Sequence, residues 1–214
     1  MDNNIRLKSV VPKNLTDQQI QNPNSVWGLD FVFCEGNRYQ VTAGSGSGKS
    51  TLIKIINGIF NDYSGLVSIG SQEITNSQID KLIQTRRNHI HTVYQDLKLF
   101  DNLSVWENIV IPSNDSESLE LAKNLIEKFK IQHIKQSVVS KVSHGQKQRV
   151  AIIRALLGNY KWILLDEPFS HLDAEISDIV YEEIIKLCEL KKAGIIITSL
   201  DERFRKMDFE QIEI

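Results

Sequence analysis

A glycine-rich segment followed by a lysine has the clearest chemistry in this sequence. Residues 41–51 read Val-Thr-Ala-Gly-Ser-Gly-Ser-Gly-Lys-Ser-Thr. Gly46 and Gly48 have no Cβ, so the backbone can wrap closely around a phosphate and point successive N–H groups at it. A helix expected over residues 50–56 adds the partial positive charge of its N-terminus. The segment therefore predicts a loop that binds the phosphates of a nucleoside triphosphate.

Two side chains of this loop have individual roles. Lys49 supplies a charge for the β- and γ-phosphates, and the hydroxyl of Ser50 is placed to ligate Mg²⁺. Ala43 stands where the usual pattern has its first glycine, and Gly44 follows it directly. The alternative is a glycine- and serine-rich surface loop, but an apolar strand before it and an apolar helix after it disfavour that reading. The expected nucleotide-binding residues of the loop are Gly44, Ser45, Gly46, Ser47, Gly48, Lys49, Ser50 and Thr51.

An apolar run that ends in two acids forms a second candidate site. Residues 162–165 are Trp-Ile-Leu-Leu, and Asp166 and Glu167 follow directly. Such a run is typical of a parallel strand buried on both faces, and α/β sheets bind ligands at the carboxyl ends of their strands. We expect Asp166 to belong to the Mg²⁺ shell and Glu167 to orient or deprotonate an attacking water.

A serine-glycine turn opens a third segment, residues 142–157. Ser143, Gly145 and Gln146 lie at the expected start of a long helix. The N–H groups at that start, which we expect to be free at Gly145 and Gln146, form a second anion site.

Five motifs in a fixed order resemble those of the nucleotide-binding subunit of ATP-binding-cassette (ABC) transporters. They are the phosphate loop (44–51), Gln95, the signature segment (143–146), the acid pair (166–167) and Ser170-His171-Leu172-Asp173. Residues 94–100 and 105–108 are similar to the branch that serves lipoprotein release, macrolide-type export and cell division.

The resemblance implies an α/β fold of the ABC ATPase type. It would have a P-loop NTPase core, with a mostly parallel sheet flanked by helices, an antiparallel β subdomain and a helical subdomain. We expect one domain over 1–214, in which 1–95 and 159–214 form the nucleotide-binding core and about 96–158 the helical subdomain. Its cofactors would be ATP and Mg²⁺.

The family's mechanism implies two partners. Two such domains sandwich ATP head to tail, as a homodimer or a heterodimer, with each signature segment facing the nucleotide of the other. Gln95 would contact the Mg²⁺ shell, and a membrane-spanning permease subunit would dock on the insert at about 96–140.

Departures from the family pattern leave a second function open. Ser199 stands where the family has a histidine that contacts the γ-phosphate, and a hydroxyl can hydrogen-bond a phosphate but carries no charge. We expect an ATPase with slow hydrolysis in which Ser199 has a catalytic role. The alternative is an ATP-gated dimerisation module with little turnover. His144 and His171 also depart from the pattern. We interpret His144 as a surface histidine without a role and His171 as a solvated or packing histidine. No aromatic residue lies between 12 and 25 to stack on adenine, and Trp27 is expected in the core.

Composition narrows the remaining classes. The chain has 214 residues and a formal charge of −2, so we expect no nucleic-acid partner, and a soluble ABC ATPase of DNA repair or translation is disfavoured. No apolar run approaches the ~20 residues that span a bilayer. We expect a cytoplasmic chain held peripherally at the cell membrane by a membrane subunit.

Cys34 and Cys188 are expected to be buried, reduced thiols.

The hydrophobic pattern predicts the remaining elements. We expect strands over 5–11, 27–33, 66–70, 91–94, 162–166 and 194–198, and another before the phosphate loop. Helices are expected over 50–56, 76–88, about 104–109, 119–129, 144–157 and 174–191.

Overall fold

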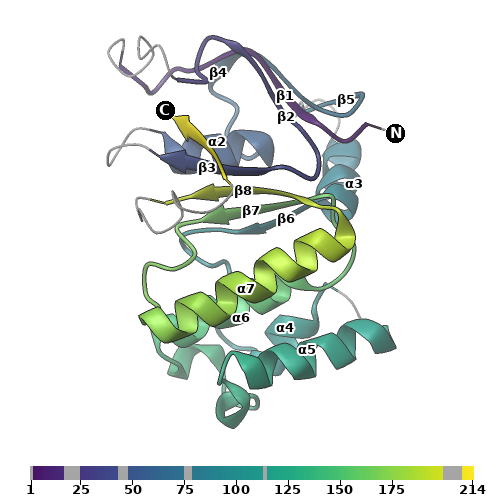
Figure 1. The fold of residues 1–214 in the computed structure, drawn as a ribbon, viewed down its shortest axis with the longest axis vertical. Helices are drawn as coiled ribbons and strands as arrows, with labels where there is room; N and C mark the ends of the chain where they lie inside the picture. Colours follow the sequence, from purple (N-terminus) through teal and green to yellow (C-terminus); the bar gives the residue numbers. More distant parts are fainter. Residues whose placement is uncertain (1, 17–24, 43–47, 75–78, 113–114, 200–208) are drawn as a thin grey trace.

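The computed structural model of this chain describes residues 2–16, 25–42, 48–74, 79–112, 115–199 and 209–214, in two sheets and their flanking helices (Figure 1). The antiparallel sheet has the order β2-β1-β4-β5 and the parallel sheet the order β6-β7-β8-β3-β9. The strands are β1 (Ile5–Pro12), β2 (Asp30–Phe33), β3 (Arg38–Thr42), β4 (Tyr63–Ile69), β5 (Gln72–Glu73), β6 (Ile90–Val93), β7 (Trp162–Asp166), β8 (Gly194–Thr198) and β9 (Glu210–Glu213).

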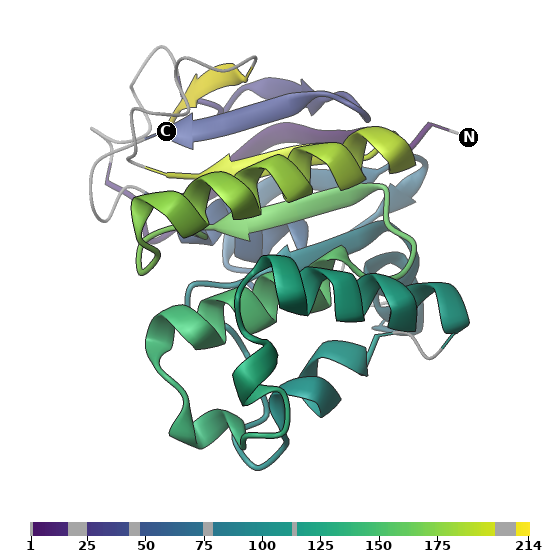
Figure 2. The same ribbon diagram turned by 60° about the horizontal axis from the view of Figure 1, so that its bottom comes forward.

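The helices divide between the two faces of the parallel sheet. They are α2 (Lys49–Ile56), α3 (Ile79–His89), α4 (Val105–Val110), α5 (Ser116–Lys128), α6 (His144–Leu156) and α7 (Ala174–Lys191). Short 3₁₀ turns, η2 (Gln132–Ile134) and η3 (Val139–Lys141), lie between α5 and α6. In Figure 1, α2 lies between the two sheets, and α6 and α7 lie on the opposite face of the parallel sheet. The turned view in Figure 2 places α4 and α5 beyond α6, at the end of the molecule away from the antiparallel sheet.

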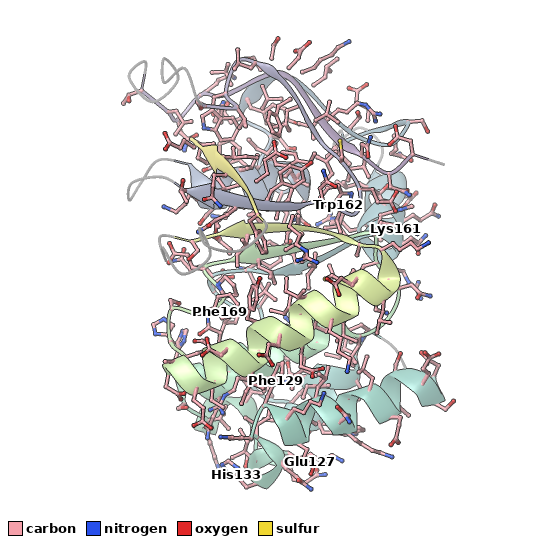
Figure 3. The ribbon with its side chains drawn as sticks, viewed as in Figure 1. Glu127, Phe129, His133, Lys161, Trp162 and Phe169 are labelled. Carbon is pink, nitrogen blue, oxygen red and sulfur yellow. The ribbon has the colours of Figure 1, made fainter. Side chains whose placement is uncertain are left out.

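Strand β7 connects the two halves of the hydrophobic core. Trp162 and Leu164 belong to the cluster shared with α2 and the antiparallel sheet, whereas Ile163 and Leu165 belong to the cluster shared with α6 and α7. Phe129 and Phe169 lie in this second cluster, on the side of α7, and are labelled in Figure 3 with Trp162. Because successive strand residues point to opposite faces, a continuous apolar run is what a strand buried on both faces requires.

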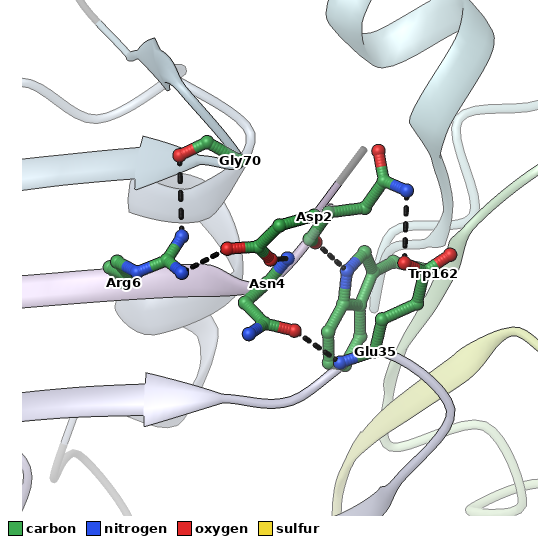
Figure 4. Close-up of polar contacts among 7 residues, drawn as sticks. Asp2, Asn4, Arg6, Glu35, Gly70 and Trp162 are labelled. Carbon is green, nitrogen blue, oxygen red and sulfur yellow. Dashed lines mark hydrogen bonds and ion pairs between the residues drawn. The ribbon is translucent and has the colours of Figure 1, made fainter.

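Polar contacts fix the antiparallel sheet to the first residue of β7 (Figure 4). Trp162 donates from Nε1 to the carbonyl of Asn3 at 2.7 Å, and the Asn3 amide donates to a carboxylate oxygen of Glu35 at 2.9 Å. The Glu35 N–H in turn donates to Oδ1 of Asn4 at 2.8 Å. These contacts hold the end of β7 opposite to Asp166, so they help to set the position of the acid pair.

Most of the predicted elements are confirmed. Helix α7 and strand β8 have the expected bounds, and α2 closes as expected at Gly58, whose φ is +62°. The N–H groups of Gly58 and Ile59 donate to the carbonyls of Ile55 and Lys54, each at 2.8 Å, as in a Schellman cap.

Helix α3 is present as expected from Ile79 to His89, and its expected start at 76–78 lies outside the described part of the chain. Three expectations need correction. The strand expected over 27–33 covers only Asp30–Phe33. Strands β5 and β9 were not expected, because neither contains an apolar run. Cys34 is exposed rather than buried, whereas burial of Cys188 raises the pKa of its thiol to about 12.

Candidate nucleotide-binding site

Parallel pairing brings four candidate segments to one edge of the sheet. Thr198 at the end of β8 pairs with Val41 on β3 and with Asp166 on β7, while Val93 at the end of β6 pairs with Leu165. The residues that follow these strands include the phosphate loop, Gln95, Glu167 and Ser199. The carboxyl edge of a parallel sheet is the usual place for a ligand.

A cavity of about 310 Å³ at this edge gathers the predicted metal ligands. Ser50, Gln95 and Asp166 all line it, and Lys54 and Tyr94 complete part of its wall. These oxygen donors come from α2, the segment after β6 and the end of β7. Mg²⁺ prefers such oxygen ligands, so the residues present fit this ion.

The start of α2 has the backbone geometry of an anion-binding turn. Gly48, at the N-cap, has φ +102° and ψ 5°, a region that residues with a Cβ rarely adopt. Lys49 is buried and Ser50 half-buried at the first turn of the helix. Trp27 is buried as expected, and a Cβ added at Gly48 would lie 3.5 Å from its ring. The predicted residues Gly44, Ser45, Gly46 and Ser47 lie outside the described residues.

Thr198 holds the acid that was predicted to serve the metal. Its Oγ1 donates to Oδ1 of the buried Asp166 at 2.7 Å. A hydrogen bond to a buried carboxylate fixes which way its oxygens point. Sequence reasoning did not select Thr198, although it is the last residue of the predicted strand beside the acid strand.

Glu167 adopts a left-handed backbone conformation, with φ +48°. This is uncommon for a residue with a Cβ and persists where the surroundings impose it. Its N–H donates to the carbonyl of Thr198 at 3.0 Å and lies 3.2 Å from Oγ1 of the same residue. Its carbonyl accepts from the Ser170 hydroxyl at 3.1 Å. The bend at Glu167 is thus fixed by hydrogen bonds to both of the peptide units that flank its Cα.

Gln148 is a further residue that sequence reasoning missed. It lies buried on α6 and donates from Nε2 to the carbonyl of Glu167 at 3.0 Å. Its Oε1 accepts from the N–H of His171 at 3.2 Å. One side chain therefore fixes the segment 167–171 to α6, the helix that begins within the signature segment. A polar residue buried in an otherwise apolar helix face was the available signal.

The signature segment is partly as expected. Ser143 caps α6 in a reciprocal capping box, in which the Gln146 N–H donates to Oγ of Ser143 at 3.3 Å. The expectation that this N–H is free is therefore wrong, because the cap uses it. At Gly145, an added Cβ would lie 2.6 Å from the carbonyl oxygen of His171, so the absence of a side chain permits close packing there.

The two histidines that depart from the family pattern lie against each other. The ring centroids of His144 and His171 are 4.0 Å apart, with an angle of 58° between the ring planes. Both residues are exposed to solvent. Both are surface histidines, as expected, and the fold packs their rings together.

Ser199 is buried at the end of β8, and its N–H donates to the carbonyl of Val41 at 3.3 Å. It therefore lies beside the strand that leads into the predicted phosphate loop.

A larger cavity, of about 1190 Å³, lies between α5 and α7, and none of the predicted site residues lines it. Its wall mixes acidic and basic side chains, including Glu183 and Lys186.

Comparison with known proteins agrees with this geometry. The family described as ABC transporter matches residues 26–170. The chain is 31% identical over 187 residues to the lipoprotein-releasing system ATP-binding protein LolD of Shewanella frigidimarina, covering 85% of this chain and 78% of that protein. It is 32% identical over 176 residues to the LolD of Idiomarina loihiensis, covering 79% and 77% of the two chains.

Two solved structures share the fold at 24% sequence identity. One is a dimeric post-hydrolysis state of the ATP-binding cassette MJ0796 bound to ADP and Pi, with a TM-score of 0.82, covering 98% of this chain and 96% of that one. The other is a dimeric structure of MJ0796, described as a bacterial ABC transporter cassette, with a TM-score of 0.83 and coverage of 98% and 94%. Among the described residues, no helix has the length and apolar character needed to cross a bilayer.

Proposed function

This chain belongs to the ABC transporter family, and we propose that it is the ATP-binding and ATP-hydrolysing subunit that powers a transporter of the lipoprotein-release type. The observation that carries the proposal is the cavity lined by Ser50, Gln95 and Asp166, the residue that precedes Glu167. Names of similar proteins support the same assignment, since both LolD relatives are ATP-binding proteins of a lipoprotein-releasing system.

Different residues of the site serve ATP binding and ATP hydrolysis. Lys49 and the phosphate loop would bind the triphosphate. Ser50, Gln95 and Asp166 would hold Mg²⁺, which would neutralise phosphate charge. Thr198 keeps the Asp166 carboxylate oriented through its 2.7 Å hydrogen bond. Glu167 orients the attacking water or accepts its proton. The position of Glu167 depends on the contacts of its backbone N–H with Thr198 and of its backbone carbonyl with Ser170 and Gln148.

Two copies, or this chain and a close relative, would bind ATP between them. The signature segment of one chain, with Ser143 and Gly145 at the N-terminus of α6, would face the triphosphate held by the other chain. The dimeric state of the similar solved structures supports this arrangement. The signature segment and the phosphate loop would thus contact one nucleotide only across a dimer.

A membrane-spanning subunit is the second proposed partner. It would dock on the helical part, about residues 96–140, and hold this chain at the cytoplasmic face of the membrane. We keep the division into a nucleotide-binding core (1–95 and 159–214) and a helical subdomain (about 96–158) as part of this proposal. Gln95 lies where the first of these parts meets the second, so it could couple them.

Dimerisation tests the proposal directly. The variant Glu167→Gln with saturating Mg-ATP should form a stable dimer, measured by sedimentation, because ATP would bind without being hydrolysed. The matched control Glu167→Gln/Lys49→Ala should stay monomeric, since it lacks the phosphate-binding charge. A Glu167→Gln protein that stays monomeric with Mg-ATP, both alone and with its membrane subunit, would contradict the proposal.

Ser199 motivates the second candidate, an ATP-gated dimerisation module with little turnover. A hydroxyl at this position cannot supply the charge of an imidazolium. If that missing charge limits hydrolysis, Ser199→His should raise the steady-state rate while the affinity for ATP stays within about twofold. An unchanged rate in Ser199→His would show that the serine does not limit turnover.

A further inference from the structure

Two residues that depart from the family pattern are in contact, although 26 positions lie between them in the sequence. His144 is the first residue of α6, and His171 lies in the loop that runs from Glu167 to α7. Their rings are 4.0 Å apart between centroids. The contact therefore joins the signature segment to the loop that carries Glu167.

One cation acts on this histidine pair. The charge of Lys147, one turn along α6, disfavours a proton on His144, and the Lys147 Nζ lies 3.6 Å from the carboxylate of Asp101 in the segment before α4. No ion pair between described residues includes either imidazole. The N-terminus of α6 adds a partial positive charge.

Two further charged groups of the neighbouring elements make hydrogen bonds to the backbone. Arg149 on α6 donates to the carbonyls of Gly145, at 3.2 Å, and Phe129, at 2.9 Å. Asp173, in the loop of His171, caps α7 by accepting from the N–H of Ile176 at 2.9 Å. Neither group contributes to the pKa shift of His144, which comes from burial, His171 and Lys147.

A proton on His144 is accordingly disfavoured in the separate subunit. Burial, the neighbouring His171 and the charge of Lys147 together hold the pKa of His144 below its ordinary value of 6.5. An anion that approaches the start of α6 would reverse this balance, because it would be attracted to a protonated imidazole.

We propose that His144 and His171 form a proton-binding pair that couples ATP-dependent dimerisation to pH. His144 is neutral in the separate subunit, and it takes up one proton from solvent when the triphosphate held by a second copy approaches the start of α6. His171 is the positioning residue that keeps His144 neutral until then. The inference rests on the head-to-tail dimer of the proposed function.

The sign of the pH effect follows from linkage. A group that binds a proton more tightly in the dimer makes dimerisation stronger as the pH falls through the interval between its pKa values in the two states. Above that interval neither state is protonated and the effect vanishes. We expect the dimer to tighten about tenfold between pH 8 and pH 6, within the limit of one proton for each His144.

Sedimentation of the Glu167→Gln protein with Mg-ATP between pH 6 and pH 8 tests the proposal. Since ATP itself titrates in this range, the readout is the difference between variants. At pH 6 the dimer of Glu167→Gln/His144→Gln should be about tenfold weaker than that of Glu167→Gln. At pH 8 the two proteins should have the same dissociation constant. Glu167→Gln/His133→Gln, which removes an exposed histidine on η2, should behave as the parent. The same pH dependence with and without His144 overturns the inference and leaves the proposed function intact, whereas no dimer at any pH overturns both.

A second measurement needs no nucleotide. NMR titration of the separate subunit should place the pKa of His144 below 6.5, and His171→Ala should bring it closer to that value. The backbone contacts of residue 171 with Gly145 and Gln148 remain available in this variant. A His144 that titrates at or above 6.5, or that does not respond to His171→Ala, overturns the proposal.

Discussion

Gln148 donates from Nε2 to the backbone carbonyl of Glu167 at 3.0 Å, across a separation of 19 residues. Its other side-chain atom, Oε1, accepts from the N–H of His171 at 3.2 Å. Helix α6 therefore holds both ends of the segment that carries the proposed general base. Glu167 has a left-handed backbone, so its position depends on such contacts more than that of an unstrained residue would.

Replacing Gln148 should reduce hydrolysis more than it reduces ATP binding. In Gln148→Ala the Glu167 carbonyl and the His171 N–H lose a buried partner, which costs about 1–3 kcal/mol of stability. We expect kcat to fall at least about tenfold. A misplaced Glu167 would raise the activation free energy of hydrolysis, and each 1.4 kcal/mol of that rise slows the reaction tenfold. Steady-state assays with a nucleotide-binding titration measure both effects. Gln132→Ala, on the exposed turn η2, is the control, and equal kcat in the two variants would show that Gln148 does not position Glu167.

Removing only the hydroxyl of Thr198 should weaken the use of Mg-ATP. Thr198→Val keeps the shape of the side chain but removes the 2.7 Å hydrogen bond to Asp166. Bonds to charged groups contribute about 1.5–3 kcal/mol, so we expect a loss of roughly tenfold in kcat/KM. Thr198→Ser keeps the hydroxyl and should remain within about threefold of the parent. If valine and serine behave alike, the hydroxyl does not orient Asp166.

A methyl group at position 145 should separate the first turn of α6 from the loop of His171. Gly145→Ala would place a Cβ 2.6 Å from the His171 carbonyl oxygen, and the clash is with backbone, which yields less readily than a side chain. The expected cost of about 1–3 kcal/mol exceeds the gain of up to about 1 kcal/mol from the better helix propensity of alanine. Urea unfolding measures the change, and an alanine variant as stable as the parent would contradict this packing.

His91 should make the folded protein sensitive to acid. Its Nδ1 lies 2.8 Å from the carbonyl of Ala155, which assigns the proton to Nδ1, and burial holds the pKa of the imidazole below its ordinary value. Lys191 lowers this pKa further, so the folded state binds a proton less readily than the unfolded state does. Stability contributed by the neutral ring is present above the unfolded pKa of 6.5 and is lost as the pH falls below it, by up to about 1.4 kcal/mol per pH unit.

The variant His91→Gln isolates this contribution. It removes the titrating group, so its free energy of unfolding should fall less steeply between pH 7 and pH 5 than that of the parent. His133→Gln, at an exposed site, should leave the slope unchanged. Equal slopes in all three proteins would remove His91 as the origin of the acid sensitivity.

Much of the fold could be predicted because its signals are local. The apolar run over 162–165 predicts a doubly buried strand, and the spacing of apolar residues over 174–191 predicts α7 with the bounds that it has. Strand β9 could not be predicted in this way. It has one buried residue, Ile212, and it exists because β3 offers a free edge to which it pairs in parallel.

In the candidate site, too, the local motifs could be predicted and the contacts between distant residues could not. The sequence alone determined the motifs and their order, from which the phosphate loop and the acid pair are predicted, because each motif carries its chemistry in neighbouring residues. Only the tertiary structure decided that Ser50, Gln95 and Asp166 share one cavity, that Gln148 holds Glu167, and that the rings of His144 and His171 meet. Such contacts join residues far apart in the chain and depend on how helices pack on the sheet, and packing leaves no periodic signature in the residues that it brings together.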